Sequence, residues 1–274
     1  MRWRAHLAIY RQMVWRQLLT TARYPLNLAA EMAVPVVMAL AFTLATLLFV
    51  PDGVAQATGQ LAGVPVYGFV IYLAFSNALW RMARSVREEQ WQGTLVALHL
   101  TPAPPYLDLL ARVSLTTLWT LAGALLAVVA ARAIVGRLPL YLSWQAVCVL
   151  ALTLSGSAGL GFAMAAYTLV MREGAETVAN LLEFALLVVC AGFYPFGALP
   201  PAMRAISRWV PFSYSVDAFR TLLLGAPAGW PELAPLHVEL GIITLFGIAS
   251  PLLGYQLYRA AEHHLRHIGQ LGDY

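Results

Sequence analysis

This sequence of 274 residues contains no lysine, and all 17 of its basic residues are arginines. A P-loop nucleotide site needs a lysine to reach the phosphates, so these residues contain no P-loop ATPase. Charged residues of both signs are also scarce, at 11% of the chain against about 25% in an average soluble domain. Since 60% of the residues are hydrophobic, the composition indicates an all-α polytopic membrane protein.

Cysteine and histidine are too few and too scattered to build a reactive centre. Cys148 and Cys190 lie in apolar runs without a CxxC motif, which excludes a disulfide scaffold. The six histidines lie at or beyond the ends of those runs, so none can activate a membrane serine. His263, His264 and His267 suggest a metal-binding tail, but a basic tail attracted to anionic lipid is favoured. We therefore expect no metal or cofactor in this chain. We also expect no nucleic-acid partner, because the arginines do not form a basic stripe.

Six apolar runs are candidates to cross a bilayer, which takes about 20 residues of helix. We expect these spans at 26–50, 66–80, 107–134, 142–171, 178–196 and 237–258. Before them, residues 1–24 carry an apolar stripe at helical spacing, flanked by arginines. This pattern predicts an amphipathic helix in the membrane interface. The alternative is an extension of the first span that carries a topogenic charge cluster.

Two longer segments interrupt the apolar runs. Residues 81–104 are the most polar stretch and predict a short amphipathic helix, in water, between the second and third spans. Residues 198–236 predict two short external helices, begun by Pro200-Pro201 and Pro211, with Gly225 as a helix end. Most arginines lie on one side if both termini and residues 81–104 are cytoplasmic, and the positive-inside rule favours that orientation.

Two acids and a set of small residues stand out within the predicted spans. Glu31 and Glu183 are costly in a membrane. We expect each of them either to contact substrate along a transport path or dimer face, or to hydrogen-bond a neighbouring helix. Ser157, Gly161 and Ala165 recur every four residues, which lets another helix approach closely.

Two stretches resemble a known protein family. Residues 87–95 read REEQWQGTL and are followed by Thr101-Pro102. They resemble the R-E-x-x-G-T-L-x-x-L-x-x-T-P coupling region between spans two and three of ABC-2 type exporter membrane subunits. Residues 193–225, which include FYP, LP and PFSYSVDAFR, resemble the external pattern before the last span of that family. Together with the six-span layout, the two motifs cover nearly the whole chain.

The resemblance implies a permease of an ATP-driven exporter of the drug, antibiotic, lipid or polysaccharide class. The all-arginine, alanine- and leucine-rich usage indicates a GC-rich prokaryote, so we expect the chain in a prokaryotic plasma membrane. The resemblance also implies a homodimer or paired permeases joined to two cytoplasmic ATPase subunits, which carry the ATP and Mg²⁺. A charged helix in the coupling region would give the ATPase a stiff handle. The residues expected to provide it are Arg84, Arg87, Glu88, Glu89, Gly93 and Thr94. A solvated positive loop is the alternative interpretation of the same residues.

The external stretch is expected to form a gate, in preference to a substrate site. Asp217 and Arg220 are three residues apart on a predicted helix, which positions them to pair. The expected gate residues are Tyr194, Pro195, Pro211, Tyr214, Asp217 and Arg220.

A stand-alone channel or secondary transporter is the alternative function. A secondary carrier favours two repeated halves with broken helices near the midplane, and residues 1–137 and 138–274 show no such repeat. A membrane-embedded enzyme is opposed by the lack of clustered acids, histidines and lysines. Transport driven by a separate ATPase is therefore the favoured function.

Overall fold

The computed structural model describes residues 2–48, 55–93, 105–136, 138–171, 174–227 and 229–268. Within these ranges the chain forms helices joined by turns, with no strand, so the predicted all-α fold is confirmed. The helices are α1 (Arg2–Arg23), α2 (Pro25–Leu48), α3 (Ala55–Trp91), α5 (Pro105–Val135), α6 (Trp144–Val170), α7 (Ala175–Val189), the short 3-10 helix η1 (Phe196–Ala198), α8 (Pro201–Ser207), α9 (Pro211–Leu224) and α10 (Leu236–Ile268).

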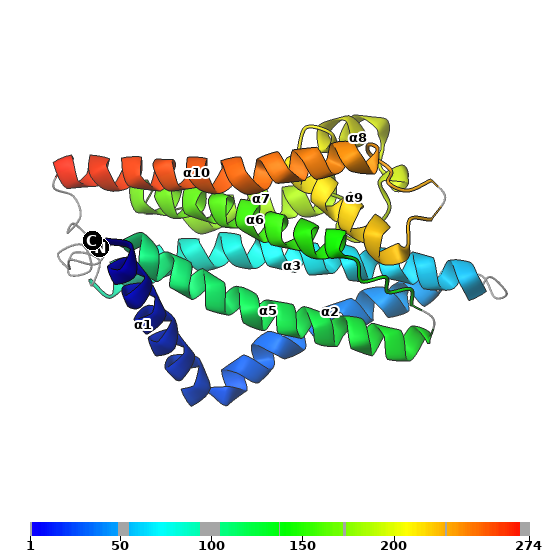
Figure 1. Ribbon diagram of the computed structural model, residues 1–274, viewed down its shortest axis with the longest axis horizontal. Coiled ribbons are helices and arrows are strands. Elements are labelled where there is room, and N and C mark those ends of the chain that lie inside the picture. Colours follow the sequence, from blue (N-terminus) through cyan, green and yellow to red (C-terminus); the bar gives the residue numbers. More distant parts are fainter. Residues whose placement is uncertain are drawn as a thin grey trace.

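The long helices run side by side along the longest axis of the molecule (Figure 1). Helices α3, α5, α6 and α10 form the main bundle, and α1 and α2 make a V on one side of it. Helix α1 begins at one end of the molecule, and α3 and α10 finish there; we call this the terminal end (Figure 1). The opposite end holds α8 and α9, and we call it the distal end. The first and last helices thus share one end, as the orientation with both termini on one side requires.

Five of the described helices are long and apolar enough to cross a membrane: α2, α3, α5, α6 and α10. The span expected at 178–196 is different, because α7 ends at Val189 after 15 residues. At about 1.5 Å per residue it reaches about 22 Å, less than the hydrocarbon thickness of about 30 Å. Ala191 has a positive φ of 50°, and the turn that follows leads into η1. The helix therefore ends before a full span is complete, and the turn and η1 lead the chain to α8 at the distal end (Figure 1).

Helix α3 is much longer than the span expected at 66–80. It runs unbroken for 37 residues, so residues 81–91, expected as the start of a separate coupling helix, are its last three turns. No glycine or proline occurs between Gly68 and Gly93, and arginine, glutamate and glutamine are good helix formers. Gly93, with a φ of +67°, follows the helix end. Thr94 and the rest of the 81–104 segment lie outside the described residues.

The basic tail expected after residue 258 is also helical. Helix α10 continues to Ile268, past Pro251 and through the tail. Glu262 and Arg266 form an ion pair four residues apart on this extension. The helix that ends the chain is therefore about ten residues longer than the apolar run alone indicates.

Glycines set the closest helix contacts in the bundle. A Cβ at Gly159 of α6 would collide with the backbone of Ser250 on α10, and one at Gly254 of α10 would collide with the backbone of Gly159. Gly161 packs in the same way against the carbonyl of Ala78 on α3. The predicted close approach at the small residues of α6 is confirmed, and it brings α6 against two helices.

Helix α3 and helix α9 lie deepest in the fold. The apolar part of α3 is largely buried, and every residue of α9 from Phe212 to Leu224 is buried. Helix α9 begins with Pro211 at its first turn and ends at Gly225, whose φ is +79°, as the sequence indicated. Its burial places three of the predicted gate residues inside the molecule, namely Tyr214, Asp217 and Arg220. Tyr194 and Pro195 are half-buried, and Pro211 is exposed.

Candidate functional site

A cluster of charges around Arg112 binds the terminal end of α3 to α5. The guanidinium of Arg112 lies 2.6 Å from the carboxylate of Glu89 on α3 and 2.7 Å from that of Asp108 on α5. Glu88 is further from it, at 3.6 Å. Since charge-assisted hydrogen bonds are the strong ones, Arg112 fixes the end of α3 in place. Sequence reasoning gave Arg112 no role, although its spacing of four from Asp108 was a signal for such a pair.

Two further residues bind the same part of α3 to α7 and α6. Arg87 lies 3.7 Å from Glu176 in the first turn of α7. Gln90 is buried, and its side-chain amide donates to the carbonyl of Thr168 on α6 at 3.4 Å. The end of α3 is thus attached to three neighbouring helices, so a force applied there reaches all of them.

Arg84, Glu88 and Trp91 form the exposed part of this end, and we call them the exposed stripe. Their spacing of four and three residues places them on one face of α3. Trp91 is 75% exposed, and the Arg84 guanidinium lies 4.8 Å from the ring centroid of Trp80. Large exposed aromatic side chains beside charges are typical of protein interfaces. Of the described residues predicted to contact an ATPase, Arg84, Glu88 and Gly93 are exposed, whereas Arg87 and Glu89 are half-buried.

Glu183 on α7 accepts three hydrogen bonds from one face of α3. Tyr72 donates at 2.7 Å, the indole N–H of Trp80 donates at 2.6 Å, and Ser76 donates to the same oxygen as Tyr72. The carboxylate joins α7 to α3, which supports the helix-contact interpretation of this acid. The three donors recur every four residues, so the sequence contained a signal for this polar face of α3.

Glu31 on α2 pairs with Arg81 on α3 at a distance of 3.2 Å. Both side chains are partly exposed, Glu31 to 49% and Arg81 to 34%. The two acids predicted to lie on a substrate path or dimer face therefore differ, because Glu183 is satisfied by three donors and Glu31 lines an open pocket.

At the distal end, Arg220 is fully buried within α9. Its guanidinium donates to the carbonyls of Ala191, Gly192 and Tyr194, at 2.5, 2.7 and 3.1 Å. These carbonyls follow the end of α7, where a helix leaves acceptors unsatisfied. Burial lowers the pKa of Arg220 to about 10, which leaves the group charged at neutral pH. Arg220 therefore fixes the turn by which the chain leaves α7, and Gly68 on α3 leaves the space that its guanidinium occupies.

Asp217 does not form the predicted ion pair with Arg220 in the described part of the chain. One of its carboxylate oxygens instead accepts the backbone N–H groups of Glu232 and Leu233, at 2.8 and 2.7 Å. Its carboxyl also contacts that of Glu239 on α10, and burial raises the pKa of Asp217. Asp217 thus holds the connection between α9 and α10.

The other predicted gate residues also bind backbone groups near them. The hydroxyl of Tyr194 donates to the carbonyl of Val188 at 2.5 Å, and that of Tyr214 donates to the carbonyl of Arg208 at 2.8 Å. Pro195 precedes η1, and Pro211 begins α9. These residues build a fixed structure at the distal end, and their movement as a gate remains a prediction.

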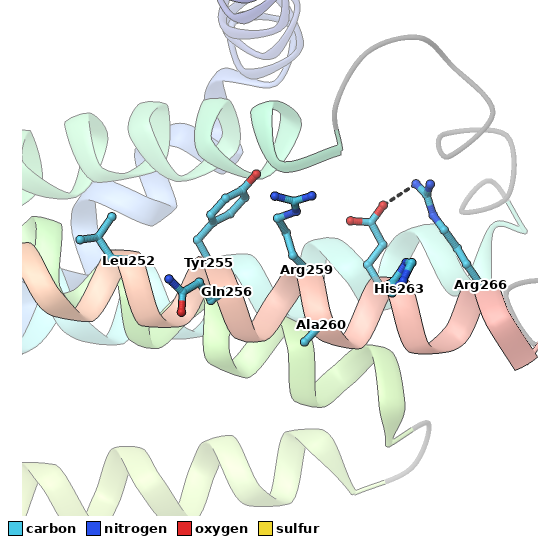
Figure 2. Close-up of a pocket in the computed structure, with 8 residues that line it drawn as sticks. Leu252, Tyr255, Gln256, Arg259, Ala260, His263 and Arg266 are labelled. Carbon is cyan, nitrogen blue, oxygen red and sulfur yellow. Dashed lines mark hydrogen bonds and ion pairs between the residues drawn. The ribbon is translucent and has the colours of Figure 1, made fainter.

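A groove of about 540 Å³ runs along the terminal end of α10 (Figure 2). Arg259, His263 and Arg266 line it together with Tyr255, and the Arg259 guanidinium lies 5.9 Å from the Tyr255 ring centroid. Figure 2 shows these side chains along one side of the helix, where Arg266 is paired with an acid of the same helix. The described residues contain no group of three metal-ligating side chains. The groove is suited to anionic groups, in line with the predicted attraction of the tail to anionic lipid.

Comparison with known proteins gives one family. The family model described as ABC-2 type transporter matches residues 9–224 of this chain, which is more than half of its length. The match includes α3 with its exposed stripe, the acid Glu183 and the whole of α9. A search of curated proteins gave no match.

Proposed function

We propose that this chain, which belongs to the ABC-2 type transporter family, is the permease of an ATP-driven exporter. It moves an amphipathic or hydrophobic molecule outward from the cytoplasm or the inner leaflet. Two ATPase subunits bind its terminal end from the cytoplasm and carry the ATP and Mg²⁺, and a second permease copy completes the path. The membrane is the plasma membrane of a prokaryote, with both termini in the cytoplasm.

The composition supports a separation of transport from ATP hydrolysis. These 274 residues contain no lysine, so a P-loop must lie outside them. A partner that hydrolyses ATP changes the permease only if it contacts two permease states differently. The exposed stripe offers that partner a cation, an anion and a large aromatic side chain on one face of α3. This stripe is the observation that carries the proposal.

Helix α3 supports a mechanical role for the stripe. Its 37 residues extend about 55 Å at 1.5 Å per residue, so one helix joins the terminal end to the region around α9. Near the stripe it is attached to α5, α6 and α7, and toward the distal end Gly68 lies against Arg220. A displacement of the stripe is thereby carried to the turn after α7 and to the buried α9.

A pull-down from solubilised membranes of the native host tests this proposal. Wild type is compared with Trp91→Ala and with the control Trp209→Ala, which removes an even more exposed tryptophan between α8 and α9. We expect a P-loop ATPase to co-purify with wild type and Trp209→Ala, and to be lost or reduced at least tenfold with Trp91→Ala. Failure of any P-loop ATPase to co-purify with wild type would contradict the proposal and favour a stand-alone channel or secondary transporter.

A further inference from the structure

A polar pocket of about 160 Å³ lies at the elbow between α1 and α2, against α3 and α5. Its size is below the roughly 300–1,000 Å³ of pockets that enclose drug-sized ligands, so it fits a small polar group. The polar side chains that line it include Gln17, Asn27, Glu31, Arg81 and Trp119. All of them come from the described part of the chain, and none belongs to the exposed stripe.

Opposite charges lie next to each other in this pocket. Arg81 and Glu31 are 3.2 Å apart, yet they keep 34% and 49% exposure. An ion pair this open contributes little to stability, so stabilisation alone is a weak reason for placing both charges at the edge of the apolar spans. A ligand that carries one negative and one positive group can meet both residues at once.

Trp119 adds an unsatisfied donor to the same wall. Its indole N–H is buried and has no acceptor among the described residues. A buried donor without a partner is destabilising, and an oxygen atom of a ligand would satisfy it. Trp119 and Arg81, which both carry donors, thus line the same pocket as Glu31, which can pair with a cation.

The pocket lies where the apolar parts of α2 and α3 meet polar residues, which is the level at which we expect lipid headgroups. Glu31 is in the second turn of α2, whose apolar span begins at Pro25. Arg81 is the first charged residue after the apolar part of α3. Phospholipid headgroups are the charged groups that occupy this level of a bilayer, and arginines there reach toward them.

We propose that this pocket binds the headgroup of a zwitterionic phospholipid from the leaflet at the terminal end. The phosphate lies at Arg81 and Trp119, and the ammonium lies at Glu31. The chemistry that is recognised is a phosphate joined to an amine by a short linker, as in phosphatidylethanolamine. The site does not depend on an ATPase partner, so its test and that of the proposed function can fail separately.

Native mass spectrometry of the purified full chain tests the site by titration with phosphatidylethanolamine and phosphatidylglycerol of equal acyl chains. We expect wild type to prefer the ethanolamine lipid about tenfold. Glu31→Gln should abolish this preference but retain phosphatidylglycerol, whereas Arg81→Gln should weaken both lipids about tenfold. Trp119→Phe keeps the ring and should weaken both lipids equally, a few-fold. The control Arg84→Gln removes an arginine of the same helix outside the pocket and should change neither.

Two results would overturn the site. One is an unchanged lipid preference in Glu31→Gln, and the other is an equal effect of Arg81→Gln and Arg84→Gln. If Arg81→Gln is not monodisperse, Glu31→Gln and Trp119→Phe still decide the question. An excess of soluble phosphoethanolamine separates the two sources of this chemistry: it displaces the lipid if the headgroup alone is bound, and it fails to do so if the acyl chains are also needed.

Discussion

The guanidinium of Arg112 on α5 lies 2.6 Å from the carboxylate of Glu89 on α3, whereas the neighbouring Glu88 is exposed. Both carboxylates lie within ion-pair distance of Arg112, but Glu89 is the closer and the more buried of the two. Glu89 attaches α3 to the bundle, and Glu88 belongs to the face that a partner reaches. An exposed stripe transmits movement only if its base is firmly attached, and the Arg112 cluster supplies that attachment.

Removal of Arg112 is expected to cost more stability than removal of Glu89. Arg112→Gln removes the guanidinium that Glu89 and Asp108 share, whereas Glu89→Gln keeps Asp108 paired. Hydrogen bonds to charged groups contribute about 1.5–3 kcal/mol each, so the arginine variant should melt clearly below the glutamate variant. Thermal unfolding of the purified protein measures this, with Arg208→Gln as a control at an exposed arginine. Equal melting points for the two variants would contradict the cluster.

Glu183 is expected to tolerate an amide but not an apolar residue. In Glu183→Gln, the amide oxygen can accept from Trp80 while the amide nitrogen donates to the hydroxyls of Tyr72 and Ser76, since hydroxyls also accept. Glu183→Leu leaves three donors unsatisfied and should destabilise by about 1–3 kcal/mol or more. Thermal unfolding of both variants is the measurement. A glutamine variant as unstable as the leucine variant would show that the negative charge itself is needed.

Arg220 is expected to resist replacement by lysine. Its fork donates to three carbonyls after α7, and a single ammonium cannot reproduce that geometry. Each buried acceptor left unsatisfied costs on the order of 1–3 kcal/mol. Arg220→Lys should therefore lower the thermal midpoint strongly, whereas Arg208→Lys, at an exposed position, should leave it unchanged. A fully stable Arg220→Lys variant would show that charge alone holds the turn.

Gly68 is expected to accept no side chain. A Cβ there would collide with the Arg220 guanidinium and with the carbonyl of Gly192. Gly68→Ala should destabilise by about 1–3 kcal/mol through overpacking. Gly241→Ala on α10 is the matched control, because nothing lies within 4 Å of its Cβ position. Equal melting points for the two alanine variants would contradict the close approach of α3 to Arg220.

The helical fold was predictable because apolar runs and turn-forming residues determine the backbone conformation of their own segment. Pro211 and Gly225 bound α9, and both follow from their own backbone preferences. The length of α3 was missed because a change from apolar to polar residues was interpreted as a break. Polar residues with high helix propensity continued the helix to Trp91. Hydrophobicity predicts where a membrane helix leaves the lipid, but not where the helix ends.

Partners distant in the chain were less predictable. The spacing of Asp217 and Arg220 predicted a pair, but each residue binds backbone groups 15 to 29 residues away. Those acceptors and donors appear only when the chain turns after α7 and before α10, and no side chain marks them. The donors to Glu183 are an exception, because Tyr72, Ser76 and Trp80 already share one helical face in the sequence.

Site-specific photo-crosslinking in membranes of the native host tests the docking role of the exposed stripe most directly. A photoreactive residue at position 91, and separately at position 84, is compared with one at position 209 at the distal end. We predict that a P-loop ATPase is crosslinked from positions 91 and 84 and not from position 209. If no P-loop ATPase is crosslinked from the stripe, or if it is crosslinked equally from position 209, the stripe is not the docking site.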